Sequence, residues 1–222
     1  MTASGTQPAW SRLLRVARSL IGQVNSVETI IDHWTFGGGT AMMLQINHRE
    51  SHDIDIFLPD PQQLPFLDPA KRDFEFDTPP ADYRGDGITF LKLAFEGTGE
   101  IDFIVAGALT SQPVAQRTIE HETLLLETIP EIIAKKIYHR GFSIRPRDIF
   151  DIAAAGDTHA PSIIQELQAY RKEVSNAVSA MDKLNPEFVE RAISQLAIKP
   201  EYEAIAKTAR DRAREIMRAV LL

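Results

Sequence analysis

Two aspartates one residue apart, Asp53 and Asp55, lie in an apolar segment that is typical of a β-strand. Residues two apart in a strand point to the same face, so both carboxylates would project together while Ile54 and Ile56 point into the core. Neighbouring carboxylates repel each other unless a cation lies between them, and Mg²⁺ prefers such oxygen ligands. The pair therefore indicates a metal site; its alternative is the polar face of an ordinary edge strand.

A third carboxylate, Asp102, lies in a second apolar segment, EIDFIVAG, which a hairpin or neighbouring strands would bring beside the pair. Three carboxylates on strands are typical of a two-metal site, in which one metal activates an attacking oxygen and the other neutralises leaving phosphates. Mg²⁺ fits this site, and Mn²⁺ is an alternative. Asp102, next to the attacking hydroxyl, is then the natural general base.

Three consecutive glycines, Gly37 to Gly39, precede a short apolar run that begins at Thr40. We expect a strand that turns through the glycines into a short helix capped by Thr40. Backbone N–H groups at a helix N-terminus favour an anion, and Gly38 and Gly39 would let a phosphate approach without obstruction by side chains. The stretch matches neither the Walker pattern nor G-x-G-x-x-G.

Further charged residues lie on two segments with helical character near residue 140. Lys136 and Arg140 are four residues apart and share a helical face, where they could contact a triphosphate or simply face solvent. Asp148 and Asp151 also share a face. Asp148 has an ordinary role available as a capping carboxylate in the first turn, and Asp151 one as an ion-pair partner of Arg147.

The polar residues Arg49 and Ser51 precede the first carboxylate. Arg49 could reach a phosphate and Ser51 could bond a ligand oxygen, although loops before strands are commonly polar. Composition sets wider limits: the 222-residue chain has no cysteine, so any metal must be held by oxygen or imidazole ligands. The formal net charge of -7 argues against general coating of nucleic acid, and no apolar stretch is long enough to span a membrane.

The order of the expected elements is a helix, mixed strands, and then helices only. The first 20 residues lack the apolar core of a signal peptide, and we therefore expect a cytoplasmic protein. The pattern predicts an α+β domain with a mixed sheet and flanking helices, followed by a C-terminal helical domain with a boundary near Ile129. The expected helices cover 8–24, 40–47, 130–141, 145–156, 161–183, 186–197 and 201–221. The expected strands lie near 33–39, 52–58, 73–77, 87–97, 99–107 and 121–129.

The stretch GGTAMMLQINHRESHDIDIF resembles the AbiEii/AbiGii-type nucleotidyltransferase toxins, within the superfamily of the DNA polymerase beta-like fold. In that family a GGT turn, a small apolar helix, an H-R-x-S segment and a D-x-D strand occur in this order. A second stretch, EIIAKKIYHRGFSIRPRDIFDIA, resembles the later family motifs. Together the two resemblances cover about residues 33–155.

The resemblance implies roles for individual residues. It implies that Asp53, Asp55 and Asp102 bind the metals and take part in catalysis, with Lys136 as a further catalytic residue. It also implies that nucleotide contacts come from Gly38, Gly39, Thr40, Lys136, Arg140 and Asp148. Arg49 and Ser51 are further nucleotide-binding candidates from their residue types and their place before the strand. Residues 1–129 would then form the catalytic domain, and 130–222 a helical domain that contributes nucleotide-binding residues.

The implied activity is a Mg²⁺-dependent transfer of an NMP unit from an NTP to an acceptor hydroxyl. The implied biological role is the toxin of a toxin–antitoxin pair, with tRNA as acceptor and a cognate antitoxin as partner. Two alternatives remain open at this point: transfer to a small molecule or a protein hydroxyl, and a non-catalytic interaction protein with the same fold. Strand carboxylates argue against the last, because a binding module has no need to bury them.

Overall fold

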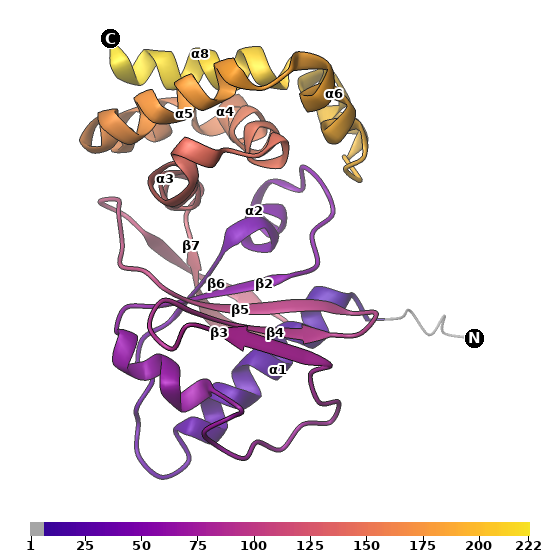
Figure 1. Ribbon diagram of the computed structural model, residues 1–222, viewed down its shortest axis with the longest axis vertical. Helices are drawn as coiled ribbons and strands as arrows, with labels where there is room; N and C mark the ends of the chain where they lie inside the picture. Colours follow the sequence, from indigo (N-terminus) through magenta and orange to yellow (C-terminus); the bar gives the residue numbers. More distant parts are fainter. Residues whose placement is uncertain (1–6) are drawn as a thin grey trace. The chain divides into compact units, whose positions relative to one another are not determined.

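The computed structural model describes residues 7–222, which form two compact units (Figure 1). The first, called the N-terminal unit, comprises residues 7–41, 51–108 and 114–126. The second, called the C-terminal unit, comprises residues 42–50, 109–113 and 127–222. The expectation that no signal peptide is present concerns residues 1–20, and residues 1–6 of these lie outside the described part. Within residues 7–222, no helix is both long and apolar enough to cross a membrane. The expected functional division at residue 129 stays a proposal.

The N-terminal unit is built on a seven-stranded mixed sheet with the strand order β3-β4-β5-β2-β1-β7-β6. β2 is antiparallel to β1 and parallel to β5, while β4 and β5 form an antiparallel hairpin. The strands are β1 (Thr35–Gly37), β2 (Ile54–Leu58), β3 (Asp82–Gly85), β4 (Phe90–Phe95), β5 (Gly99–Val105), β6 (Val114–Ile119) and β7 (Glu122–Glu127). The expected α+β class with a mixed sheet is confirmed.

Along β4, one face of the sheet is packed and the other is half-exposed. Helix α1 (Ala9–Val24) and the 3₁₀ helix η1 (Pro61–Leu67) pack against β2 and β5, because α1 carries an apolar stripe at helical spacing. Leu91, Leu93 and Phe95 of β4 are buried, and the residues between them are only half-buried. Residues that alternate with the core positions are therefore available for chemistry.

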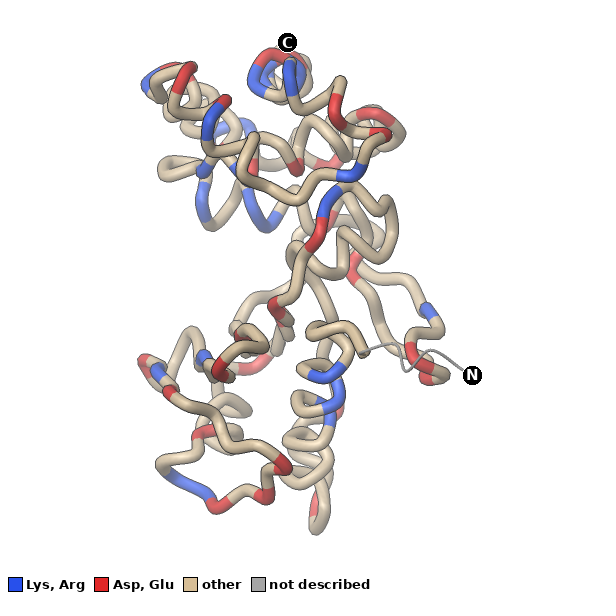
Figure 2. The backbone as a smooth tube through the Cα atoms, turned by 90° about the vertical axis from the view of Figure 1, so that its right-hand side faces the viewer, with Lys and Arg blue, Asp and Glu red and all other residues tan. Residues whose placement is uncertain are grey.

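The C-terminal unit is a bundle in which α4 packs against α3, α6, α7 and α8 (Figure 1). Figure 2 shows Lys and Arg interspersed with Asp and Glu along its helices, so neither sign of charge dominates the unit. Its helices are α3 (Ile129–Arg140), α4 (Pro146–Leu167), α5 (Arg171–Lys183), α6 (Pro186–Ser194), α7 (Glu203–Lys207) and α8 (Ala209–Leu221), with 3₁₀ turns η2 (Gly141–Ser143), η3 (Gln168–Tyr170) and η4 (Pro200–Tyr202).

Several expected element boundaries were wrong. The expected strand at 73–77 is absent, and β3 and β6 were not anticipated. The helix expected to end at Gly156 continues to Leu167, because Gly156 does not cap it. A Cβ at this position would lie 2.1 Å from Cδ1 of Ile216, so the glycine lets α8 pack directly on α4. The last expected helix, 201–221, is divided into η4, α7 and α8.

Candidate active site

The glycine turn and the metal-strand candidate meet directly. Helix α2 (Gly38–Ile46) begins at Gly38, and Gly37 pairs with Asp55 across the β1–β2 ladder. Gly38 has a φ of 69°, a region that L side chains rarely adopt, and a Cβ on it would lie 1.9 Å from Oδ2 of Asp55. Glycine is therefore needed twice here, once for the backbone and once to make room for the carboxylate.

Thr40 has a different role from the expected helix cap. Because α2 begins at Gly38, Thr40 lies inside its first turn, fully buried, and does not cap the helix. Its hydroxyl bonds to the backbone carbonyl of Asp53 and to Oγ of Ser51. Thr40 and Ser51 thus fix the segment that leads into β2. This pairing holds Asp53 next to the first turn of α2.

Two of the three candidate carboxylates lie on neighbouring strands, and the third, Asp53, directly precedes β2. Asp55 and Asp102 are register partners in the parallel β2–β5 pair, and Asp53 lies two residues before Asp55. Oδ1 of Asp53 accepts a hydrogen bond from the backbone N–H of Glu100 at 3.0 Å. The expectation that neighbouring strands bring Asp102 beside the pair is confirmed, and metal binding by these residues stays a prediction.

A lysine that the sequence reasoning missed also belongs to this group. Lys92 of β4 is the register partner of Asp102, and its Nζ lies 2.9 Å from Oδ2 of that carboxylate. It also pairs with Glu100. Burial raises the pKa of Asp102, and the ion pair with Lys92 opposes that rise. Burial alone would lower the pKa of Lys92, but its bonds to Glu100 and Asp102 together raise it, so the lysine is charged.

The chemistry of this donor set suits a hard divalent cation, since every candidate ligand is a carboxylate oxygen. Asp53 and Glu100 also raise the pKa of Asp102, which shows that the carboxylates repel one another. Among residues 7–222, however, no three His, Asp or Glu side chains are already arranged to enclose an ion. Lys92 takes up one oxygen of Asp102 and a backbone N–H takes up one of Asp53.

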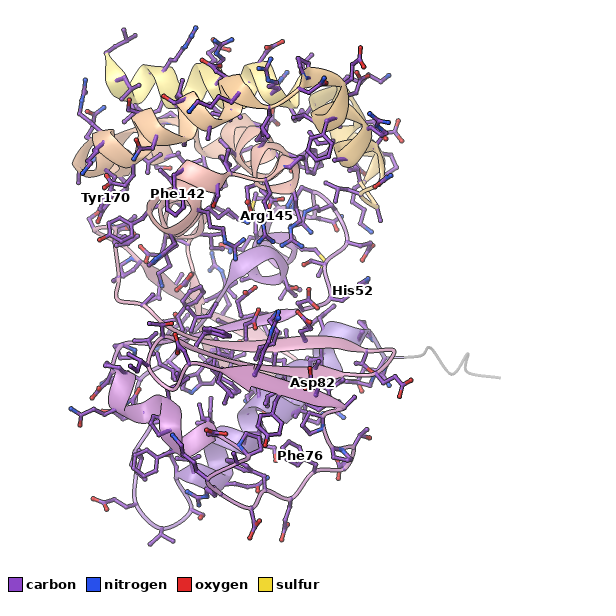
Figure 3. All side chains as sticks on the ribbon, viewed as in Figure 1. His52, Phe76, Asp82, Phe142, Arg145 and Tyr170 are labelled. Carbon is purple, nitrogen blue, oxygen red and sulfur yellow. The ribbon has the colours of Figure 1, made fainter. Side chains whose placement is uncertain are left out.

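The second block of candidates forms a buried cluster inside the C-terminal unit. Nζ of Lys136 lies 2.8 Å from Asp148 and 3.0 Å from Asp151, and all three side chains are less than one-tenth exposed. Arg140, which is 39% exposed, lies 3.7 Å from Asp148. Asp148 also accepts the backbone N–H of Arg145, which is labelled in Figure 3, and so has the expected capping role in the first turn of α4.

Asp151 is the centre of this cluster. The guanidinium of Arg49 donates to both of its oxygens, at 2.8 and 3.0 Å, and Nε2 of His48 lies 3.0 Å away. The alternative expectation of an ion pair with Arg147 was wrong, because Asp151 is fully buried against residues from other segments and Arg147 is exposed. Contacts of Arg49 and Lys136 with a nucleotide stay predictions.

The electrostatics of the cluster follow from its pairing. Burial would raise the pKa of both aspartates, but Lys136 and, for Asp151, Arg49 overcome this and hold both pKa values below the usual range. Burial lowers the pKa of His48, which is therefore neutral and donates its Nε2–H to Asp151. Two buried cations thus balance two buried anions, the arrangement that makes buried charge tolerable.

The residues that sequence reasoning missed differ in how they could have been found. The turn between β4 and β5 sets Phe95 opposite Gly99, and counting from that pair places Lys92 opposite Asp102. The sequence therefore held a signal for Lys92. His48 begins the H-R-x-S segment of the family, but no local pattern indicates its partner Asp151, which is 103 residues away in the chain.

A glycine turn that begins a short helix, two aspartates at the beginning of the next strand and a third on a parallel neighbour are the features of a nucleotidyltransferase fold. Two solved structures support that class. MenT4, a nucleotidyltransferase toxin from Mycobacterium tuberculosis, is 18% identical with a TM-score of 0.52, covering 94% of this chain and 83% of its own. A Helicobacter pylori protein assigned to the nucleotidyltransferases is 16% identical with a TM-score of 0.51, covering 97% and 96%.

The family model for the nucleotidyl transferase AbiEii toxin of type IV toxin–antitoxin systems matches residues 22–220. The chain belongs to this family and is a nucleotidyltransferase enzyme. The comparison with curated proteins finds no match. The resemblance inferred from residues 33–155 is thus confirmed and extends over nearly the whole chain.

Proposed function

We propose that the protein transfers an NMP unit from an NTP to a hydroxyl group of an acceptor, with release of pyrophosphate, and that it requires Mg²⁺. The observation that carries the proposal is the row in which Gly37, Asp55 and Asp102 are neighbours on three adjacent strands. The glycine turn that would bind phosphate and the carboxylates that would bind metal thereby belong to one compact unit. Family membership supports the reaction class.

In this proposal, Asp53, Asp55 and Asp102 would hold Mg²⁺ or Mn²⁺. The metal would neutralise charge on the transferred phosphate and acidify the attacking hydroxyl. The backbone of Gly38 and Gly39 would bind phosphate oxygens at the start of α2. Asp102 would accept the proton of the acceptor hydroxyl, a role that its raised pKa suits.

Residues of the C-terminal unit would bind the rest of the nucleotide. Lys136 and Arg140 are the proposed triphosphate contacts, and Arg140 is the more accessible of the two. Asp148 would act by holding Lys136 at 2.8 Å, and Arg49 by holding Asp151. An arginine can bind a phosphate with two parallel hydrogen bonds, which gives Arg140 both charge and geometry for this role.

We propose tRNA as the acceptor, a cognate antitoxin as the partner, and the cytoplasm, where NTPs are available, as the compartment. The toxin–antitoxin family supports the antitoxin. The exposed Arg145 and Arg147 at the start of α4 offer positive charge to a phosphate-rich acceptor despite the acidic chain.

The test is incubation with each α-labelled NTP, Mg²⁺ and total tRNA, followed by separation of the labelled products. We expect labelled RNA with the wild type and none with Asp53→Asn or Asp55→Asn. Asp82→Asn is a matched control, because Asp82 is exposed on the edge strand β3 (Figure 3). Label found on a small molecule or a protein would show that tRNA is not the acceptor. Absence of transfer to any acceptor would refute the proposed activity.

A further inference from the structure

Lys92 is a cation that already lies at one of the proposed metal ligands. The β4–β5 ladder sets it opposite Asp102, and the β5–β2 ladder sets Asp102 beside Asp55. Its Nζ lies 2.9 Å from Oδ2 of Asp102, and the lysine side chain is only 17% exposed. The ammonium therefore already pairs with one oxygen of a carboxylate that would hold a divalent ion.

We infer that Lys92 is a positioning residue that reserves Asp102, so that a first divalent ion binds at Asp53 and Asp55 and a second binds only when Lys92 leaves Asp102. The inference rests on the proposed function, because it concerns the same carboxylates. The two ions would then bind in a fixed order, and their sites would not be equivalent.

The second carboxylate partner of Lys92 makes this exchange feasible. Glu100 lies on the same strand as Asp102, is 40% exposed and also pairs with the lysine. When Asp102 turns to a metal, Lys92 keeps Glu100 as its partner and is not left as an unpaired, largely buried charge. A divalent ion and an ammonium that share one carboxylate would repel each other at this short distance.

A merely structural ion pair predicts something different. Its removal would lower the free energy of unfolding and leave metal binding unchanged, because it would not compete for the oxygens of Asp102. Competition instead predicts that removal of the ammonium strengthens the second metal-binding event. Metal affinity without substrate is thus the measurement that separates the two roles.

The experiment is a calorimetric titration of the full chain with Mn²⁺ alone, with electron paramagnetic resonance to count bound ions. We expect Lys92→Met to bind the second Mn²⁺ about tenfold more tightly than the wild type, and Lys92→Arg to stay near the wild type because it keeps the charge. Lys71→Met is the matched control, since it removes an exposed ammonium that pairs with Asp68 outside the sheet.

Glu100→Gln is an independent test, because it should change the affinity for the second Mn²⁺ in the opposite direction. It can be used even if Lys92→Met does not fold. Without Glu100, the lysine has Asp102 as its remaining carboxylate partner, so the second Mn²⁺ should bind about threefold or more weakly. Unchanged affinity for the second ion in both variants would overturn the inference and leave the proposed function intact. If the chain binds no Mn²⁺ through Asp53 and Asp55, both the inference and the proposed function are overturned.

Discussion

Substitution of Gly38 by alanine tests the link between the glycine turn and the carboxylates. The φ of 69° costs a non-glycine residue about 1–2 kcal/mol. The new Cβ would lie 1.9 Å from Oδ2 of Asp55, whereas real Cβ atoms do not approach closer than 3.0 Å. The carboxylate must therefore move by about 1 Å, and a displacement of that size costs about 100-fold in rate when it misplaces a reacting group.

Gly87→Ala is the matched control, because Gly87 also has a positive φ, of 76°, and has nothing within 4 Å of its ideal Cβ. Both variants should lose about 1–2 kcal/mol in the free energy of unfolding, measured by urea titration with fluorescence detection. Only Gly38→Ala should also lose Mn²⁺ affinity and about 100-fold in the rate of label transfer. Equal activity of the two variants would refute the argument that Asp55 needs the space at Gly38.

The remaining predictions concern the C-terminal unit. Asp151→Asn should lower the free energy of unfolding by about 3–5 kcal/mol in urea, because it leaves two buried cations without their shared carboxylate; a loss under 1 kcal/mol would contradict this. Acidification should destabilise the protein in two steps. The depressed pKa of His48 makes stability fall as the pH drops below about 6.5, and the depressed pKa of Asp151 makes it fall again below about 3.8. Urea titrations from pH 7.5 to 3 should show both steps. His48→Gln should reduce the first step but not remove it, because burial also lowers the pKa of His139 and His159. Thr128→Ala should cost about 1 kcal/mol, because the Thr128 side chain caps α3 by accepting the N–H of Glu131, and label transfer should not change.

Local signals in the sequence were sufficient for the elements that form the site. The alternation around Asp55 and Asp102 predicted two strands, because a buried face imposes a period of two. The GTG turn predicted the β4–β5 hairpin, and the proline and glycine at the ends of α3 predicted that helix. These features depend on residues close together in the chain, where steric and hydrogen-bonding preferences act directly.

Other boundaries depended on contacts that no local pattern contains. Gly156 has the residue type of a helix end, yet α4 continues through it because Ile216 of α8 packs on it. Thr40 has the residue type of a cap, yet the turn allows α2 to begin two residues earlier. Packing at Gly156 and the glycine turn before Thr40 each outweigh a local preference that is worth only about 1 kcal/mol.

The sequence by itself determined which residue types are available: a glycine turn, three carboxylates in apolar segments and a group of charged residues on two helices. Only the tertiary structure decided their partners. Strand register placed Lys92 and Asp55 on either side of Asp102, and the packing of the helical unit joined Arg49 to Asp151. The physical reason is that buried charges must find partners wherever the fold supplies them, at separations along the chain that no local pattern encodes.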